Sequence, residues 1–238
     1  DFCLSRGLGD VYKRQILRRC FTMNSVDITK AQAAQHLRSD LAATLEGQRR
    51  RTIELLEGVD IAAVTAVVEH LLECWKRGAL VAIAGNGGSA STASHMANDL
   101  VKATRVKSQR GFRAISLTDN VSLLTAFAND EGYEAVFASQ LEAVMTPGDV
   151  LVLISASGNS PNAVAAAGRA AELGASTVAL VGFDGGALAR TCDVVVRVDS
   201  EPGEYGSVED VHLVLNHMIS EALCEGIGEA ATSPDRKG

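Results

Sequence analysis

The sequence lacks the features that mark secreted and membrane proteins. Its 238 residues include five cysteines, and none of them forms a CxxC pair. Scattered cysteines without metal-binding spacing are typical of reduced, mostly buried thiols, so we expect a cytoplasmic protein. No apolar run approaches the roughly 20 residues that a membrane-spanning helix needs, and no signal-peptide pattern is present.

Aromatic and basic residues are also scarce. Only 4% of the residues are aromatic, and 22 Lys and Arg stand against 29 Asp and Glu, for a formal net charge of −7. A sequence-independent grip on nucleic acid needs clustered Lys and Arg, so we expect neither a direct nucleic-acid partner nor a membrane partner. The net charge of −7 does not exclude binding to another protein.

The two ends of the chain differ in character from its middle. Residues 1–22 show neither periodicity nor capping signals, and the stretch "DVYKRQ" resembles a translated sequencing-library adapter. We expect residues 1–22 to be a non-native or disordered leader before Met23, the alternative being a genuine basic extension. Residues 229–238 are expected to be a frayed polar tail, which leaves 23–228 as a single domain.

Short apolar runs alternate with helical segments from residue 79 onward. The expected strands lie at 79–85, 112–118, 149–157, 176–183 and 193–199. The expected helices lie at 91–102, 120–128, 132–144, 162–173 and 186–191, and a last helix begins near Ser207. This alternation predicts an α/β fold: a three-layer α-β-α sandwich with a five-stranded parallel sheet of flavodoxin-like type.

Two helical segments precede the first strand, at 27–58 and 60–78. The second has Asp60 as its candidate N-cap and Gly78 at its end. Leucines of the first recur at fourfold spacing and form one apolar stripe: Leu37, Leu41 and Leu45. These stripes must pack against something, and a dimer partner is as good a candidate as the chain's own sheet.

Two loops after expected strands are rich in Ser, Gly and Asn and lead directly into helices. They are "GNGGSAS" at 85–91, the glycine loop, and "SASGNSPN" at 155–162, the serine loop. Ligands of such sheets bind beyond the carboxyl ends of the strands, where flexible backbone N–H groups and a helix N-terminus favour an anion. Neither loop contains Lys or Arg, so we expect a single phosphate monoester, the alternative being two plain strand-to-helix turns. Their spacing fits neither nucleotide-binding glycine motif, so no nucleotide cofactor is expected.

A second constellation combines histidines with carboxylates. His95 and Asp99 lie four residues apart on one helical face, and Glu209, His212 and His217 lie on the last helix. These groups suit Zn²⁺, and they can also transfer protons as acid and base. The alternative is that each histidine is structural. Two other histidines, in the leading helices, are interpreted as surface or core residues: His36 and His70.

Together these segments resemble the SIS (sugar isomerase) domain family and, within it, the phosphoheptose isomerases. The resemblance extends from roughly residue 37 to 223 through "GNGGSAS…SHMANDL", "SLTDN", "AFANDEGYEAVFASQL", "ISASGNSPN", "GFDGG" and "VEDVHLVLNH". It implies isomerisation of sedoheptulose 7-phosphate to D-glycero-D-manno-heptose 7-phosphate through an enediol. It also implies one Zn²⁺ per subunit in the members that bind zinc, and a homotetramer that uses the N-terminal helices.

The resemblance also implies roles for individual residues. Substrate or phosphate contacts fall on Asn86, Gly87, Gly88, Ser89, Thr118, Asp119, Ser155, Ala156, Ser157, Ser160 and Glu209. Metal ligands fall on His95, Asp99, Glu209 and His217. The acid–base pair that moves the proton falls on Asp99 and His217.

Two positions depart from the family pattern. Asp99 stands where typical phosphoheptose isomerases have Glu, and Glu209 stands where they usually have Gln. Asp keeps the carboxylate but shortens its reach by about 1.5 Å, and a misplacement near 1 Å can cost about a hundredfold in rate. The His/Asp/Glu/His set favours an enzyme. The shorter Asp99 favours the alternative, a non-catalytic SIS module that binds a phosphosugar or the replication initiator protein.

Overall fold

The computed structural model describes residues 30–232, with the side chains of 37–230. The expected leader at 1–22 and the last residues of the expected tail, 233–238, therefore lie outside the described residues. The chain divides into two compact units between Gly47 and Gln48. Helix α2 (Lys30–Glu57) runs across this division. Its predicted leucine stripe lies in the first unit and is exposed there: Leu37, Leu41 and Leu45.

Helix α3 (Ile61–Arg77) has the ends that the sequence predicts. The Asp60 carboxylate accepts a hydrogen bond from the backbone N–H of Ala62 at 2.9 Å. Gly78 ends the helix in the left-handed region at φ 72°, which glycine adopts without the steric cost of a Cβ. The buried face of α3 packs on the chain's own sheet, so this helix needs no dimer partner to cover it.

Five parallel strands form the sheet in the order β2-β1-β3-β4-β5. They are β1 (Leu80–Gly85), β2 (Arg113–Ser116), β3 (Val150–Ser155), β4 (Ser176–Val181) and β5 (Val194–Arg197). Ala82 of β1 pairs with Ile115 of β2 on one side and with Leu151 of β3 on the other. The strand order reverses beside β1, and a ligand of such a sheet binds at that point, beyond the carboxyl ends of the strands.

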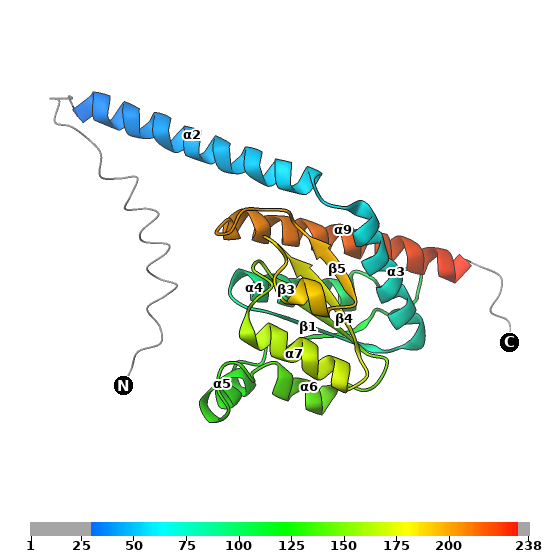
Figure 1. Ribbon diagram of the computed structural model, residues 1–238. Coiled ribbons are helices and arrows are strands. Elements are labelled where there is room, and N and C mark those ends of the chain that lie inside the picture. The colour runs from blue at the N-terminus through cyan, green and yellow to red at the C-terminus, as the bar shows by residue number, and fades with distance from the viewer. Residues whose placement is uncertain (1–29, 233–238) are drawn as a thin grey trace. The chain divides into compact units, whose positions relative to one another are not determined.

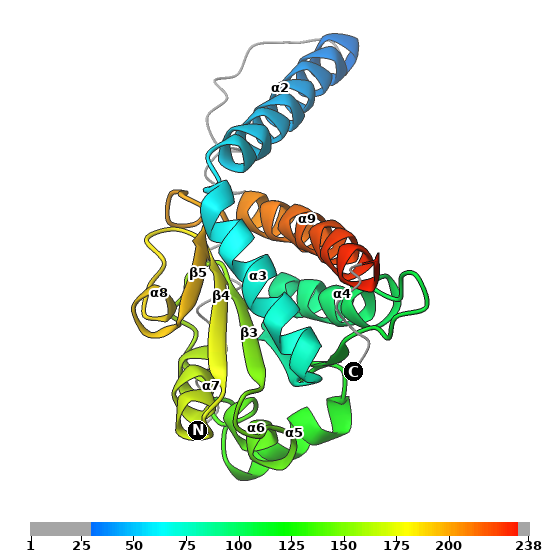
Figure 2. The same ribbon diagram turned by 90° about the vertical axis from the view of Figure 1, so that its right-hand side faces the viewer.

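Helices cover both faces of the sheet, as the three-layer prediction requires (Figures 1 and 2). One face carries α3, α4 (Gly88–Lys102) and α9 (Tyr205–Thr232). The other carries α5 (Val121–Asp130), α6 (Ala138–Val144), α7 (Pro161–Glu172) and α8 (Leu188–Thr191). Side chains alternate between the two cores, because successive strand residues point to opposite faces: Val81 and Ile83 go one way, Ala82 and Ala84 the other.

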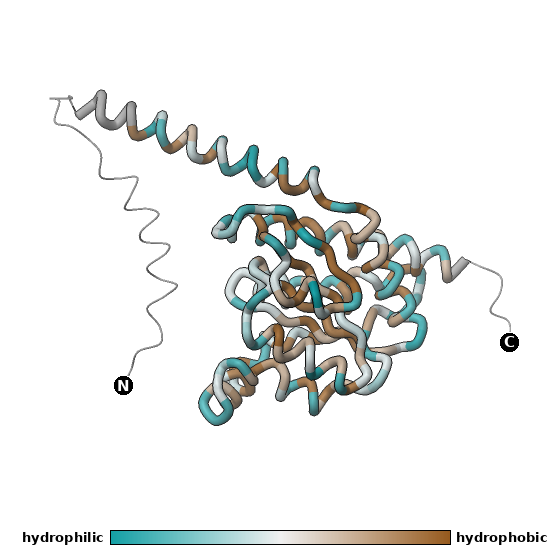
Figure 3. The backbone as a smooth tube through the Cα atoms, in the orientation of Figure 1, coloured by the Kyte–Doolittle hydropathy of each residue, from teal (hydrophilic) through white to brown (hydrophobic). Residues whose placement is uncertain are grey.

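Apolar residues concentrate along the strands and the inner helix faces of this sandwich (Figure 3). None of the helices within residues 30–232 combines the length and the apolarity that crossing a membrane would demand. Most predicted boundaries differ from the structure by one or two residues, and those of several helices show why. Helix α4 begins at Gly88 instead of Ser91, and α6 begins at Ala138 because 132–137 form turns. Helix α8 begins at Leu188 after two left-handed glycines, and α9 continues to Thr232, into the expected tail.

Candidate active site

The glycine loop ends β1 and enters α4 through three glycines whose surroundings or backbone angles favour a residue without a side chain. A Cβ added to Gly85 would lie 2.6 Å from the backbone oxygen of Ser89, and one added to Gly88 would lie 2.2 Å from Oε2 of Glu209. Gly87 has a φ of 57°, in the left-handed region. Ser89 is buried in the first turn of α4. The glycines thus let the chain turn tightly into α4 and let Glu209 of α9 approach the loop.

A cavity of about 290 Å³ opens at the carboxyl ends of β1 and β2. Three predicted binding residues line it: Asn86, Gly87 and Thr118. The other lining residues come mainly from α5 and its surroundings, and most are apolar, such as Leu124 and Phe137, whereas Thr125 and Tyr133 are polar. The predicted edge of the sheet therefore holds a cavity of a size suited to a small molecule, polar at the strand ends and apolar beneath α5.

A reciprocal pair of amides joins the glycine loop to the serine loop. Asn86 Nδ2 donates to Oδ1 of Asn162 at 2.8 Å, and Asn162 Nδ2 donates to Oδ1 of Asn86 at 2.9 Å. The hydroxyl of Tyr133 also donates to Asn86 Oδ1, at 2.9 Å. Sequence reasoning missed the roles of Asn162 and Tyr133, although both lie within the quoted motifs. Their contacts hold the Asn86 side chain at the mouth of the cavity.

Hydroxyl groups cluster behind Thr118 and Asp119. Thr118 Oγ1 lies 2.6 Å from Ser116 Oγ and 3.1 Å from Ser94 Oγ. Ser94, on α4, also donates to the carboxylate of Asp119. Ser94 was not a predicted site residue, because a serine within a helix gives no signal of the loop that it will contact. The cluster fixes the loop after β2 against α4.

The serine loop is shaped by its own hydroxyls. Ser155 Oγ accepts from the backbone N–H of Gly158 at 3.2 Å and lies 3.4 Å from Ser160 Oγ. Ser157 Oγ accepts from the N–H of Asn159 at 3.2 Å. Ser155 and Ala156 are buried, whereas Ser157 and Ser160 are half-buried. The last two hydroxyls are therefore the ones within reach of a ligand.

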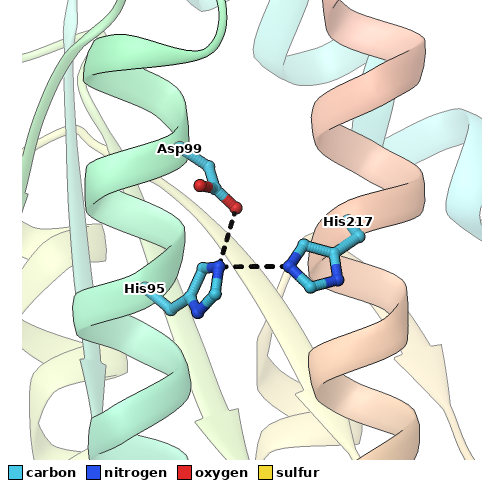
Figure 4. A group of neighbouring side chains, drawn as sticks. All are labelled: His95, Asp99 and His217. Atoms are coloured by element: carbon cyan, nitrogen blue, oxygen red, sulfur yellow. Dashed lines mark hydrogen bonds and ion pairs between the residues drawn. The ribbon is translucent and has the colours of Figure 1, made fainter.

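Helices α4 and α9 bring His95, Asp99 and His217 together as a His–Asp–His group (Figure 4). His95 Nε2 lies 3.3 Å from Asp99 Oδ2 and 3.1 Å from His217 Nε2. The two rings meet edge to face, with their centroids 4.9 Å apart. One potential ligand atom from each residue lies within 4.8 Å of the others. Two imidazoles and a carboxylate that converge in this way match the donor set of a Zn²⁺ site with an open position.

Asp99 is held from two sides. Asn216 Nδ2, on α9, donates to Asp99 Oδ2 at 2.9 Å, and Asn98 Nδ2 lies 3.3 Å from Asp99 Oδ1. The Asp99 side chain is 15% exposed, against 41% for His95. Sequence reasoning missed Asn216 as well, because its position on α9 lies on the face that the helical period turns toward the protein interior.

Two other residues of α9 do not join the His–Asp–His group. Glu209 directs its carboxylate toward Gly88, where burial, with the nearby Asp210 as a smaller cause, raises its pKa. His212 is fully buried, and burial lowers its pKa to about 4. His212 is therefore a neutral core residue at pH 7. Its role is structural, which is the alternative given above for each histidine. Of the four predicted metal ligands, three converge within the described residues: His95, Asp99 and His217.

The sequence and the fold of this chain are similar to those of known proteins. Residues 48–182 match the profile of the SIS domain. The phosphoheptose isomerase of Trichlorobacter lovleyi is 37% identical over 166 residues, which cover 70% of this chain and 83% of that protein. The phosphoheptose isomerase of Roseiflexus sp. is 38% identical over 175 residues, 74% of this chain and 85% of that protein. The solved structure of phosphoheptose isomerase from Neisseria gonorrhoeae aligns with a TM-score of 0.70 at 31% identity, covering 81% of this chain and 99% of that one.

Proposed function

This chain belongs to the SIS domain family and, within it, to the phosphoheptose isomerases, and we propose that it converts sedoheptulose 7-phosphate to D-glycero-D-manno-heptose 7-phosphate. The observation that carries this proposal is the His–Asp–His group beside the glycine loop. A module that only binds a sugar phosphate needs no such group, whereas an aldose–ketose isomerase needs an acid and a base on either side of a carbonyl.

In the proposed reaction, Asp99 and His217 move one proton between C1 and C2. A base removes a proton from C1 of the ketose while an acid protonates the oxygen on C2, which gives the enediol. After the base has exchanged its proton with solvent, a proton is delivered to C2 as the oxygen on C1 loses its own, which gives the aldose. Asp99 on α4 and His217 on α9 approach from opposite sides, so one can act at carbon while the other acts at oxygen.

We further propose that the His–Asp–His group holds a Zn²⁺ ion. Its nitrogen and carboxylate atoms lie within 4.8 Å of one another, which fits the zinc donor set. When bound, Zn²⁺ supplies a Lewis acid that polarises the carbonyl. Glu209, the fourth predicted ligand, lies on the glycine-loop side, and we assign it to the substrate.

The other end of the substrate is assigned to the loops. We propose that Ser157 and Ser160, with the N–H groups of the serine loop, bind the phosphate, and that Asn86 and Thr118 bind the sugar. Gly87, Gly88 and Ser89 shape the glycine loop, Asp119 supports Thr118, and Ser155 and Ala156 support the serine loop. The half-buried hydroxyls and the cavity at Asn86 support this assignment.

The proposal also covers the oligomeric state of the protein and its location in the cell. We propose a homotetramer in which the exposed leucine stripe of α2 is covered by another subunit, and a cytoplasmic location. The described cysteines are all free, which fits a reducing compartment: Cys74, Cys192 and Cys224. Light scattering that gives the mass of a monomer would contradict the tetramer.

Incubation with sedoheptulose 7-phosphate, with and without added Zn²⁺, tests the activity. Proton NMR should show an aldoheptose phosphate appearing and, in D₂O, deuterium entering at C2. Tight binding of the sugar phosphate without turnover, in both the native protein and Asp99→Glu, would instead support the non-catalytic SIS module.

A further inference from the structure

Asn216 is a fully buried polar residue, and only the nitrogen of its side-chain amide has a hydrogen-bond partner among the described residues. Its Nδ2 donates to Asp99 Oδ2 at 2.9 Å. Its Oδ1 has no hydrogen-bond partner among the described residues, and the side chain is 0% exposed. A buried acceptor without a partner destabilises a fold, and an apolar side chain of similar size would avoid that cost. The hydrogen bond to Asp99 is therefore the one interaction that Asn216 makes and an apolar residue at this position would not make.

The oxygen that Asn216 contacts is the one that faces the reaction centre. Asp99 Oδ2 lies 3.3 Å from His95 Nε2 and accepts from Asn216. An aspartate carboxylate is joined to the backbone through one methylene, and its χ2 angle has only broad preferences. The amide from α9 removes that freedom, so Oδ2 is held between the two helices. On its own helix Asp99 has two neighbours: His95 contacts Oδ2, and Asn98 contacts the other oxygen, Oδ1, at 3.3 Å.

We propose that Asn216 is a positioning residue that holds the Asp99 carboxylate in its working orientation, for proton transfer and for the metal. This inference rests on the proposed function. A merely structural role is the competing interpretation. The same stripe of α9 offers a matched control, because Ser220, one turn further on, is also buried and its Oγ also lacks a partner among residues 37–230.

The test measures Asn216→Leu and Ser220→Ala, each in the native and the Asp99→Glu background. In the native background, Asn216→Leu should lower kcat about tenfold to a hundredfold, with KM within about twofold of the native value. It should weaken binding of Zn²⁺ alone by about tenfold to a hundredfold. In the Asp99→Glu background, where the carboxylate is displaced by one methylene, the same change should lower kcat by less than about threefold, because the contact is already lost. Ser220→Ala should leave all of these values unchanged.

Several outcomes overturn the proposal: an unchanged kcat in Asn216→Leu, an equal loss in both backgrounds, or a similar loss in Ser220→Ala. Asn216→Leu should fold, since it removes an unpartnered buried acceptor. If it does not, Asn216→Ala, which removes the donor without burying a charge, is measured in its place with the same expected loss. If the native protein lacks turnover, the proposed function fails, and the Zn²⁺ dissociation constant of the variant then decides the role of Asn216: weakened binding supports it and unchanged binding overturns it.

Discussion

The Nε2 atoms of His95 and His217 lie 3.1 Å apart, although 122 positions separate the two residues in the chain. They meet because α4 and α9 pack side by side on one face of the sheet, each presenting one histidine at the same level (Figure 4). Asp99, one turn beyond His95, completes the group. The two imidazoles and the carboxylate are thus supplied by two helices that pack on the same face of the sheet.

Removal of the Asp99 charge should abolish most turnover without loss of substrate binding. Asp99→Asn keeps the shape, but a neutral amide cannot take up the proton, so kcat should fall about 10²- to 10⁴-fold. The dissociation constant for the sugar phosphate should change little, because the phosphate is assigned to the loops in the proposed site. Steady-state kinetics and calorimetric titration measure the two quantities. Asp130→Asn, at an exposed position at the end of α5, is the control. Native turnover in Asp99→Asn would remove Asp99 from the mechanism.

Loss of the Ser157 hydroxyl should weaken phosphate binding. A hydrogen bond to a charged group contributes about 1.5–3 kcal/mol, so Ser157→Ala should raise the dissociation constant for sedoheptulose 7-phosphate roughly tenfold to a hundredfold. Calorimetric titration gives the constant directly. Thr65→Ala, which removes an exposed hydroxyl from α3, should bind like the native protein. Unaltered affinity in Ser157→Ala would reject the assignment of the serine loop to the phosphate.

The serine loop should tolerate no side chain at Gly158. A Cβ there would lie 2.0 Å from the backbone oxygen of Gly185, and the φ of 62° disfavours any other residue. Gly158→Ala should therefore lower the free energy of unfolding by more than about 1–2 kcal/mol. Gly168 lies inside α7 with open space around it, so Gly168→Ala should instead raise stability by about 0.5–1 kcal/mol. Denaturant titration measures both changes, and equal effects at the two positions would contradict this account.

Burial of His212 should make the fold sensitive to acid. Its pKa is lowered to about 4 in the folded protein, from 6.5, so the unfolded chain binds the extra proton between these values. Stability should be fully present above pH 6.5 and should be lost as the pH falls toward 4, by on the order of 3 kcal/mol. His212→Leu should flatten this part of the profile. Denaturant midpoints measured at pH 7.5, 6 and 5 test this prediction. If the midpoint of His212→Leu falls with pH as steeply as that of the native protein, His212 is not the cause of the acid sensitivity.

Local patterns were sufficient to predict the elements of the fold. Apolar runs such as 79–85 form strands because a buried parallel strand must be apolar on both faces. Asp60 and Gly78 bound α3 because capping depends on side chains and φ angles near the helix end. Boundaries were less well predicted where turns intervened, as before α6, because apolar composition alone does not distinguish a turn from the start of a helix.

The strand–helix order, the two hydroxyl-rich loops and the residue types available for acid–base and metal chemistry follow from local patterns along the chain. Which of these side chains meet depends on the tertiary structure. It brought His217 to His95 and Asp99, kept Glu209 and His212 outside their group, and linked the loops through Asn86 and Asn162. It also revealed Asn216 as a partner of Asp99. Periodicity and capping act within a few residues, whereas contacts between α4 and α9 depend on how both helices pack on the sheet.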